Sequence, residues 1–385
     1  MRYIKEKLLA KVMQRTGLVN LPLHSGKAPP WLFKRMVRLA GAISSALVYE
    51  YGNDEFLRRI SNPYWFQALS CVIGFDWHSS GTTTTTCGAL KESVNKLNLG
   101  IRVAGGKGKT SRKTPDEIGD SDLGLSTENI NRLVYSSKLS AKVDTSLIQD
   151  GYQLYHHCLM FTEKGKWAVI QQGMDEISGY ARRYHWLSDN VKAFVEEPHN
   201  AICCDKKNEE TLDMTAKESM ESRKISLDII NDDISHITKY FNKSIQKTIG
   251  DFSDKKLIEF SMTPRHAMID MNKRNIETLR KAHEFQPGTY EELVAIKGIG
   301  PKSIRALALI SGLVYGKQAS WKDPVKYSFA HGGKDGFPYP VDKEAYDRSI
   351  LTLMEAVEMA KIGEKDRLHA IRRLDNLYHR SCCSH

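Results

Sequence analysis

The sequence lacks a long hydrophobic run and a secretory signal. Its uninterrupted apolar stretches fall well short of the roughly 18 residues that a membrane-spanning helix needs. The N-terminal segment MRYIKEKLLAKVMQRTG has neither the apolar stretch nor the small-residue cleavage site of a signal peptide. We therefore expect a cytoplasmic protein without a membrane partner.

The cysteine pattern excludes a disulfide framework. The seven cysteines are odd in number, and no two of them form a C-x-x-C pair, so neither a disulfide scaffold nor a zinc ribbon is indicated. His199 with Cys203–Cys204, and the C-terminal Cys-Cys-Ser-His, are poor matches to a tetrahedral metal site. We expect reduced thiols, and the sequence identifies no metal ion.

The sequence also has no excess of acidic residues over basic ones. The 385 residues include 56 lysines and arginines against 46 aspartates and glutamates, a formal net charge of +10. Such a balance suits a polyanionic partner, because lysine and arginine bound to phosphates release condensed counterions. The charge favours nucleic acid as the partner without identifying it.

A change of composition near residue 205 predicts two domains, 1–205 and 206–385. Single cores stop growing near roughly 250 residues, so a chain of this length is expected to divide. The stretch DKKNEETLDMTAKESMESRK is polar and charged, and helical spacing dominates beyond it. We expect an α+β protein, in which a mixed α/β N-terminal domain precedes a mostly helical C-terminal domain.

Two elements of the N-terminal domain are indicated clearly. Apolar residues recur at helical spacing from Trp31 to Leu47, which is typical of a buried helix. Aromatic and β-branched residues flank a turn at 162–166, which predicts a β-hairpin over 153–174.

The segment LNLGIRVAGGKGKTSRKTP predicts a strand that opens into a basic glycine loop. It is not a phosphate-binding P-loop, because that pattern requires glycine where Val103 stands and a helix after the loop. ATP hydrolysis is excluded on this ground. The loop either is simply solvated or contacts a nucleic-acid backbone through Lys107, Lys109, Arg112 and Lys113.

The segment ARRYHW mixes cations with aromatic rings. Arg182 and Arg183 precede a tyrosine, a histidine and a tryptophan, a combination that suits the holding of unpaired bases. A helix with one aromatic side is the alternative.

The strongest signal lies at 289–313, TYEELVAIKGIGPKSIRALALISGL. Thr289 and Glu292 form a capping box that opens a short helix, and a second helix starts at Ser303. This segment resembles the helix-hairpin-helix family of DNA-binding motifs. The predicted DNA-binding residues are Lys297, Gly298, Ile299, Gly300, Pro301, Lys302 and Ser303.

The chemistry of this turn suits a phosphate. Glycines allow backbone angles closed to other residues and a close approach of the amides to an anion. A helix N-terminus adds partial positive charge and free N–H groups, and lysines add full charges. Because such contacts reach the backbone and not the base edges, we expect DNA binding without sequence preference. A glycine-rich connection that binds nothing, or that binds protein, is the alternative.

Two residues extend the resemblance to catalysis. In helix-hairpin-helix DNA glycosylases a lysine at the start of the second helix attacks the sugar C1′, and an aspartate after a short P-V-D stretch assists. Lys302 and Asp342 match these positions, although they lie farther apart in this chain than in those enzymes. Phosphate contact by Lys302 and simple helix capping by Asp342 are the alternatives.

A second catalytic route runs through Asp76 and His78. Both follow an apolar run and precede a serine–threonine loop, a setting in which polar residues commonly serve function. Carboxylates and histidines hold the metal ion that activates water against a phosphodiester. In a nuclease of this kind the cofactor is Mg²⁺ or Mn²⁺.

Nearly the whole chain resembles a prokaryotic and archaeal family known as domain-of-unknown-function family 763. The resemblance implies a cytoplasmic prokaryotic protein and names no reaction. The segments that carry it are RTGLVNLPLHSGKAPPWLF, WFQALSCVIGFDWHSSG, GGKGKTSRKTP, YHHCLMFTEKGKWAVIQQGM and YSFAHGGKDGFPYPVD.

Together these features predict a sequence-independent DNA-binding protein that incises the strand, as a metal-dependent nuclease or as a glycosylase or AP lyase of DNA repair. A non-catalytic or architectural DNA-binding protein is one alternative, and an RNA-binding protein is another. The sequence leaves open a homodimer, the metal and the preferred DNA structure.

Overall fold

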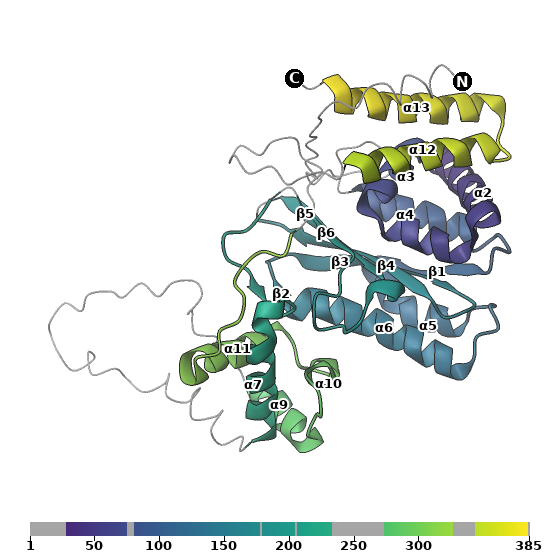
Figure 1. The fold of residues 1–385 in the computed structure, drawn as a ribbon. Coiled ribbons are helices and arrows are strands. Elements are labelled where there is room, and N and C mark those ends of the chain that lie inside the picture. The colour runs from purple at the N-terminus through teal and green to yellow at the C-terminus, as the bar shows by residue number, and fades with distance from the viewer. Residues whose placement is uncertain are drawn as a thin grey trace.

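The chain folds as helices packed on both faces of an antiparallel sheet, which is the predicted α+β class (Figure 1). The structure is a computed structural model, and it describes residues 28–74, 81–177, 179–204, 206–232, 273–325 and 343–383. Within these ranges, no helix combines the length and apolar character needed to cross a bilayer.

Five strands form the central sheet in the order β1-β3-β4-β5-β6, and all neighbours are antiparallel. Their bounds are Ile101–Lys107 for β1, Gln153–Thr162 for β3, Trp167–Asp175 for β4, Tyr180–Leu187 for β5 and Ala201–Cys203 for β6. β3 and β4 confirm the predicted hairpin. Because helices cover both faces, β4 and β5 are buried along almost their whole length instead of alternating.

Helices from two distant parts of the chain form layers over one face of the sheet (Figure 1). The inner helices are α2 (Pro30–Ser61), α3 (Pro63–Ile73) and α4 (Gly81–Val94). The outer helices α12 (Lys343–Met359) and α13 (Glu364–Cys383) pack on α2 and α3. Asn62 starts α3, because its side-chain oxygen accepts hydrogen bonds from the amides of Tyr64 and Trp65. Arg373 of α13 donates to the carbonyl of Val72 at 2.7 Å, so the C-terminal helices are attached to α3.

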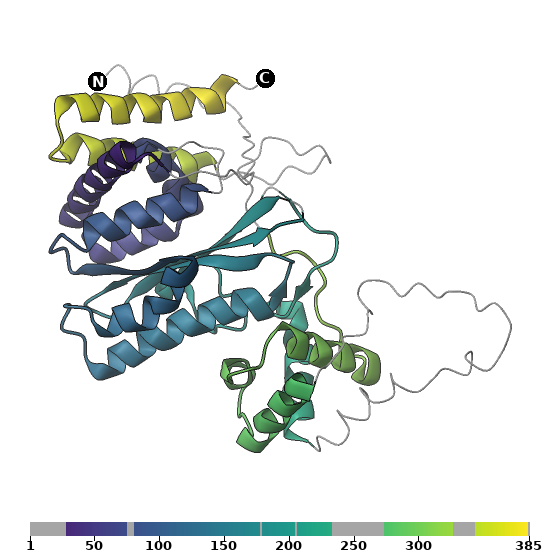
Figure 2. The same ribbon diagram turned by 180° about the vertical axis from the view of Figure 1, so that it is seen from behind.

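The other face is covered by α6 (Thr127–Ser146), with α5 (Thr114–Gly119) beside it. A group of four helices packs near α6 at one end of the molecule (Figure 2). It comprises α7 (Met220–Asn231), α9 (Lys273–Phe285), α10 (Tyr290–Ala295) and α11 (Pro301–Tyr315). The short elements are β2 (Ile148–Gln149), paired with β7 (Leu212–Asp213), and the 3₁₀ turns η1 (Gly108–Lys113), η2 (Ser188–Asn190) and η3 (Lys217–Ser219).

Two hydrophobic cores result, one on each face of the sheet. Successive strand residues divide between them, since side chains alternate along a strand: Met160 and Ile170 face the first core, and Leu159 and Val169 face the second. Both cores include residues from before and after position 205. The division into 1–205 and 206–385 stays a prediction.

Candidate nucleic-acid interface and adjoining pocket

A surface turn joins α10 to α11, as the sequence predicts for these two helices. Thr289 caps α10 by accepting a hydrogen bond from the amide of Glu292 at 3.1 Å. The Glu292 carboxylate in turn accepts from the amide of Gly288 at 2.9 Å, so the capping pair closes one residue before the cap itself.

The turn depends on one glycine in the left-handed region. Gly298 has φ +101°, and a Cβ placed there would lie 2.9 Å from Cγ2 of Thr278 on α9. Ile299 is buried in the second core with 2% exposure, which anchors the turn. Only glycine satisfies both the backbone angle and the close approach of α9.

The exposed side of the turn is positive. Lys297 and Lys302 are exposed, and α11 starts at Pro301, which has no N–H group. Among the described residues, no side chain caps the start of α11, and the first N–H groups of a helix have no partner within the helix. Helix N-termini with free amides and nearby cations bind anions readily.

Two contacts hold the turn against the rest of the protein. Nζ of Lys142 on α6 donates to the carbonyl of Ile296 at 2.5 Å, and Nε2 of Gln149 on β2 donates to the carbonyl of Pro301 at 2.8 Å. Burial lowers the pKa of Lys142 to about 8. The turn is therefore fixed on both sides of Gly298.

A small pocket of about 160 Å³ lies beside the β2–β7 pair, lined in part by His199 and Asp213. Nε2 of His199 lies 2.5 Å from Oδ1 of the fully buried Asp144. Asp144 also accepts from Nε2 of Gln171 at 2.6 Å and from Nε1 of Trp186 at 3.1 Å. A carboxylate that holds one ring nitrogen leaves the other as a proton acceptor, the arrangement of an oriented general base.

Burial raises the pKa of Asp144, and the interaction with His199 and the hydrogen bond from Trp186 oppose this shift. Burial likewise raises the pKa of Asp213, against hydrogen bonds from the hydroxyl and amide of Thr215 at 2.6 and 2.8 Å. Glu218 is exposed at the pocket, and Lys322 is a cation there. With acidic groups in excess, a phosphodiester would enter this pocket only together with a cation.

The small β2–β7 sheet contacts both the pocket and the turn. Gln149, which bonds Pro301, pairs with Leu212 across the small sheet, and Asp213 next to it lines the pocket. Asp213 also bridges to Ser320 at the far side of β7. A displacement of β2 would therefore disturb both features.

A wider cavity of about 900 Å³ borders α6 and the β3–β4 turn. Its rings include Trp167 and Phe194, which stack at 5.9 Å, and Tyr135, whose hydroxyl donates to Glu291 of α10 at 2.9 Å. Cations line it, but Lys166 is already paired with two aspartates. The charges of this cavity are mixed, because Glu128 and Asp189 line it together with Arg132, Lys164 and Lys166.

The profile of a family described as Protein of unknown function (DUF763) matches residues 17–341. The chain belongs to this family. No curated protein and no solved structure matches it. In this DUF763 chain the matched range includes the turn, the His199 pocket and the whole sheet.

The predicted catalytic residues of the DUF763 chain are not brought together by the described part of the structure. Asp76, His78 and Asp342 lie outside the described residues. Lys302 is exposed in the first turn of α11. Their catalytic roles stay predictions.

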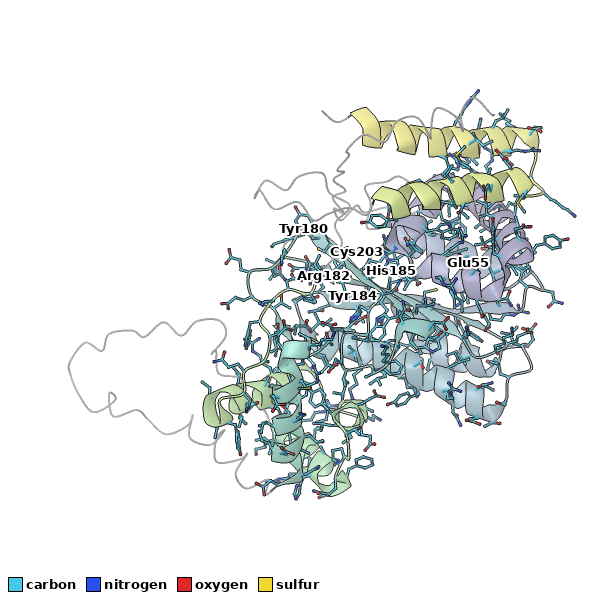
Figure 3. All side chains as sticks on the ribbon, viewed as in Figure 1. Glu55, Tyr180, Arg182, Tyr184, His185 and Cys203 are labelled. Atoms are coloured by element: carbon cyan, nitrogen blue, oxygen red, sulfur yellow. The ribbon has the colours of Figure 1, made fainter. Side chains whose placement is uncertain are left out.

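Four predicted DNA-binding residues have buried side chains: Ile299 and Ser303 of the turn, and Arg182 and Arg183 of the sheet. The segment ARRYHW forms most of β5, where Figure 3 labels Arg182 on the sheet. Arg182 pairs with Asp150 and Asp323, both at 2.8 Å, and Arg183 lies over the ring of Phe66 at 4.8 Å. Neither arginine has exposed surface. In this arrangement both side chains stabilise the fold and cannot contact DNA.

The predicted basic loop, in contrast, is on the surface. It spans the end of β1 and η1, and its four cations are exposed: Lys107, Lys109, Arg112 and Lys113. Nζ of Lys107 lies 5.7 Å from the centre of the Tyr155 ring, which places a cation beside an aromatic surface.

The Asp144–His199 pair was missed by sequence reasoning. The two residues are 55 positions apart, one on a helix and one in a loop, so no local spacing signals them. One signal was present: Asp144 lies on the buried side of α6 next to Val143, and a carboxylate on an apolar side needs a partner.

Proposed function

We propose that this protein binds the sugar–phosphate backbone of DNA without reading its sequence, and that the turn at 296–303 makes the central contact. The observation that carries the proposal is the pairing of an uncapped helix N-terminus with exposed Lys297 and Lys302 on a turn that is fixed by Lys142 and Gln149. A turn that is already held in place loses little conformational entropy on binding an anion.

The exposed loop at 107–113 supplies a second set of cations for the same partner. Contacts of this kind go to phosphates, so they add affinity without selecting bases. The resemblance of 289–313 to the helix-hairpin-helix family favours DNA over RNA. None of the cysteines with described side chains forms a disulfide, which agrees with the proposed cytoplasmic location.

Fluorescence anisotropy with labelled oligonucleotides tests this proposal. We expect single- or double-stranded DNA of unrelated sequences to bind with similar affinity at low ionic strength, and matched RNA to bind more weakly. Gly298→Val with Gly300→Val should weaken binding at least tenfold. No association with any oligonucleotide, or unchanged affinity in the double variant, would refute the proposal. Tighter binding of RNA than of DNA would identify RNA as the partner.

A second proposal is strand incision at the His199 pocket, which the Asp144–His199 geometry favours. His199 would accept a proton from water through Nδ1, while the water oxygen bonds to phosphorus and the bond to the leaving sugar oxygen breaks. Asp213 and the neighbouring carboxylates would hold a Mg²⁺ or Mn²⁺ ion. The charge of this ion would offset the repulsion between the acidic pocket and the phosphodiester. The pocket, of about 160 Å³, is large enough for a phosphate group.

Cleavage of labelled DNA with Mg²⁺, Mn²⁺ or a chelator tests incision separately from binding. We expect metal-dependent cleavage that His199→Gln reduces at least a hundredfold while DNA affinity is kept. If His199→Gln leaves cleavage intact and Asp76→Ala abolishes it, the metal site lies at 76–78 instead. Borohydride trapping on abasic DNA that is lost in Lys302→Ala would identify a lyase, and binding with no cleavage would leave a non-catalytic DNA-binding protein.

A further inference from the structure

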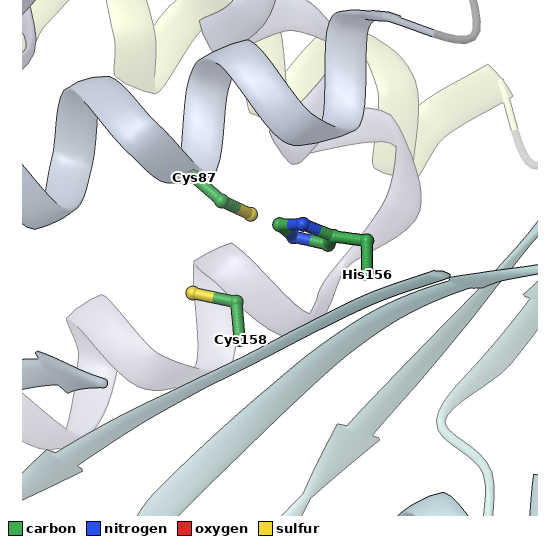
Figure 4. A group of neighbouring side chains, drawn as sticks. All are labelled: Cys87, His156 and Cys158. Carbon is green, nitrogen blue, oxygen red and sulfur yellow. The ribbon is translucent and has the colours of Figure 1, made fainter. Parts of the chain in front are cut away.

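Three side chains that bind soft metals meet between α4 and β3. Cys87 comes from α4, and His156 and Cys158 come from the same face of β3, two positions apart. One ligand atom of each lies within 4.8 Å of the others, and all three residues are buried. Figure 4 shows the three side chains near one another, with the sulfur of Cys87 directed toward the imidazole ring of His156. In the described part of the chain this is the one group of three metal-binding side chains of this kind.

His156 is buried without hydrogen-bond partners, which a role in packing alone does not explain. Its exposure is 1%, and neither Nδ1 nor Nε2 has a hydrogen-bond partner among the described residues. A buried polar atom without a partner costs stability, and native proteins rarely keep two on one ring. The neighbouring His157, in contrast, uses both ring nitrogens, with Ser137 at 2.8 Å and Gln171 at 2.9 Å.

Burial favours the ligand form of the ring. A charged imidazolium is costly where water is excluded, and His156 is buried and pairs with Lys107 across the sheet. A neutral imidazole is the form that donates an electron pair to a metal. Cys87 and Cys158 are buried beside the ring. A metal ion that replaces the thiol protons removes the cost of burying bare thiolates.

We propose that Cys87, His156 and Cys158 bind a Zn²⁺ ion. Zn²⁺ displaces the two thiol protons to solvent, and the two thiolates balance its charge in a buried setting where hard oxygen ligands are missing from the set. Three protein ligands leave a fourth position for water or a small anion. The ion would join α4 to β3 and so attach the helical layer of the first core to the sheet.

This site is separate from the DNA-binding turn and from the His199 pocket. His156 pairs with Lys107 in the sheet, at the start of the basic loop. Zinc would therefore also fix the strand position from which that loop leaves.

The test uses the full chain, purified under reducing conditions, loaded with Zn²⁺ and freed of excess metal by gel filtration. We expect about one zinc ion per chain by mass spectrometry, and loading with Co²⁺ should give the sulfur-to-cobalt charge-transfer band and the visible bands of a tetrahedral site. Cys87→Ala and His156→Gln should lose the metal. Cys71→Ala, a buried cysteine of α3 in the same core, is the matched control and should keep it.

The cobalt spectrum of the unmodified chain decides the matter even if a ligand variant does not fold. Absence of bound metal in the reduced chain, cobalt binding without a sulfur band, or equal metal loss in Cys71→Ala would overturn the proposal. A disulfide between Cys87 and Cys158 in peptides of freshly purified protein would overturn it as well.

Discussion

Lys142 on α6 reaches the carbonyl oxygen of Ile296 with its Nζ atom, at 2.5 Å, two residues before the left-handed Gly298. Gln149 makes the corresponding contact with Pro301 on the other side of that glycine. The turn before α11 is therefore held by a helix and a strand that lie more than 140 residues earlier in the chain. A turn held in this way keeps its amides in one arrangement, which is what recognition of an anion requires.

The half-buried amine of Lys142 should make stability depend on pH. Its pKa falls from 10.5 to about 8 in the folded state, so between these values the unfolded chain binds more protons than the folded chain. The contribution of Lys142 to the free energy of unfolding therefore rises with pH across this window and is flat below it. Urea unfolding of the wild type and Lys142→Met measures the difference. An advantage of the wild type over the variant that shrinks with rising pH would contradict this prediction.

Replacing Gly298 by alanine should weaken both the fold and DNA binding. A left-handed alanine costs roughly 1–2 kcal/mol, and the new Cβ also meets Thr278 at 2.9 Å. Gly316→Ala is the matched control, because Gly316 has φ +68° and open space around it. Thermal unfolding and anisotropy should show the larger loss of stability, and the only loss of affinity, in Gly298→Ala. Thr278→Ala should recover part of the stability.

The buried ion pairs of Arg182 should dominate local stability. Asp323 accepts from Nη1 and Nη2 of Arg182 at 3.1 and 2.8 Å and is itself buried. Removing one partner of a buried pair typically costs about 3–5 kcal/mol, and we expect Asp323→Ala to fall in that range by urea unfolding. Asp189→Ala breaks the partly exposed pair with Lys166 and should cost less than about 1 kcal/mol. Equal costs would show that burial does not control the Arg182 pairs.

The two turn lysines should account for part of the salt dependence of DNA binding. The logarithm of the binding constant falls with the logarithm of the salt concentration, and each phosphate contact that is lost reduces the magnitude of this slope by about one. Lys297→Gln with Lys302→Gln should therefore reduce the magnitude of the slope by about two. Lys361→Gln with Lys365→Gln changes the net charge equally on exposed residues near the start of α13 and should leave the slope unchanged. The same slope in both double variants would remove the turn from the interface.

Local interactions made much of the fold predictable. The hairpin over 153–174 follows from branched and aromatic residues on both sides of a short turn, and the start of α10 follows from the Thr289 cap. These features depend on residues a few positions apart, so their spacing is visible in the chain itself. The glycine turn was predictable for the same reason, because Gly298 is required by a local backbone angle.

The capping pair, the hairpin, the turn and the helices on either side of it can be predicted from neighbouring residues, because backbone geometry and short-range hydrogen bonds control them. Three contacts depend on how distant segments pack: the buried ion pairs of Arg182, the contact of Asp144 with His199, and the group of Cys87, His156 and Cys158. The physical reason is packing: which strand face a helix covers depends on the whole core, and that choice determines which distant side chains become neighbours.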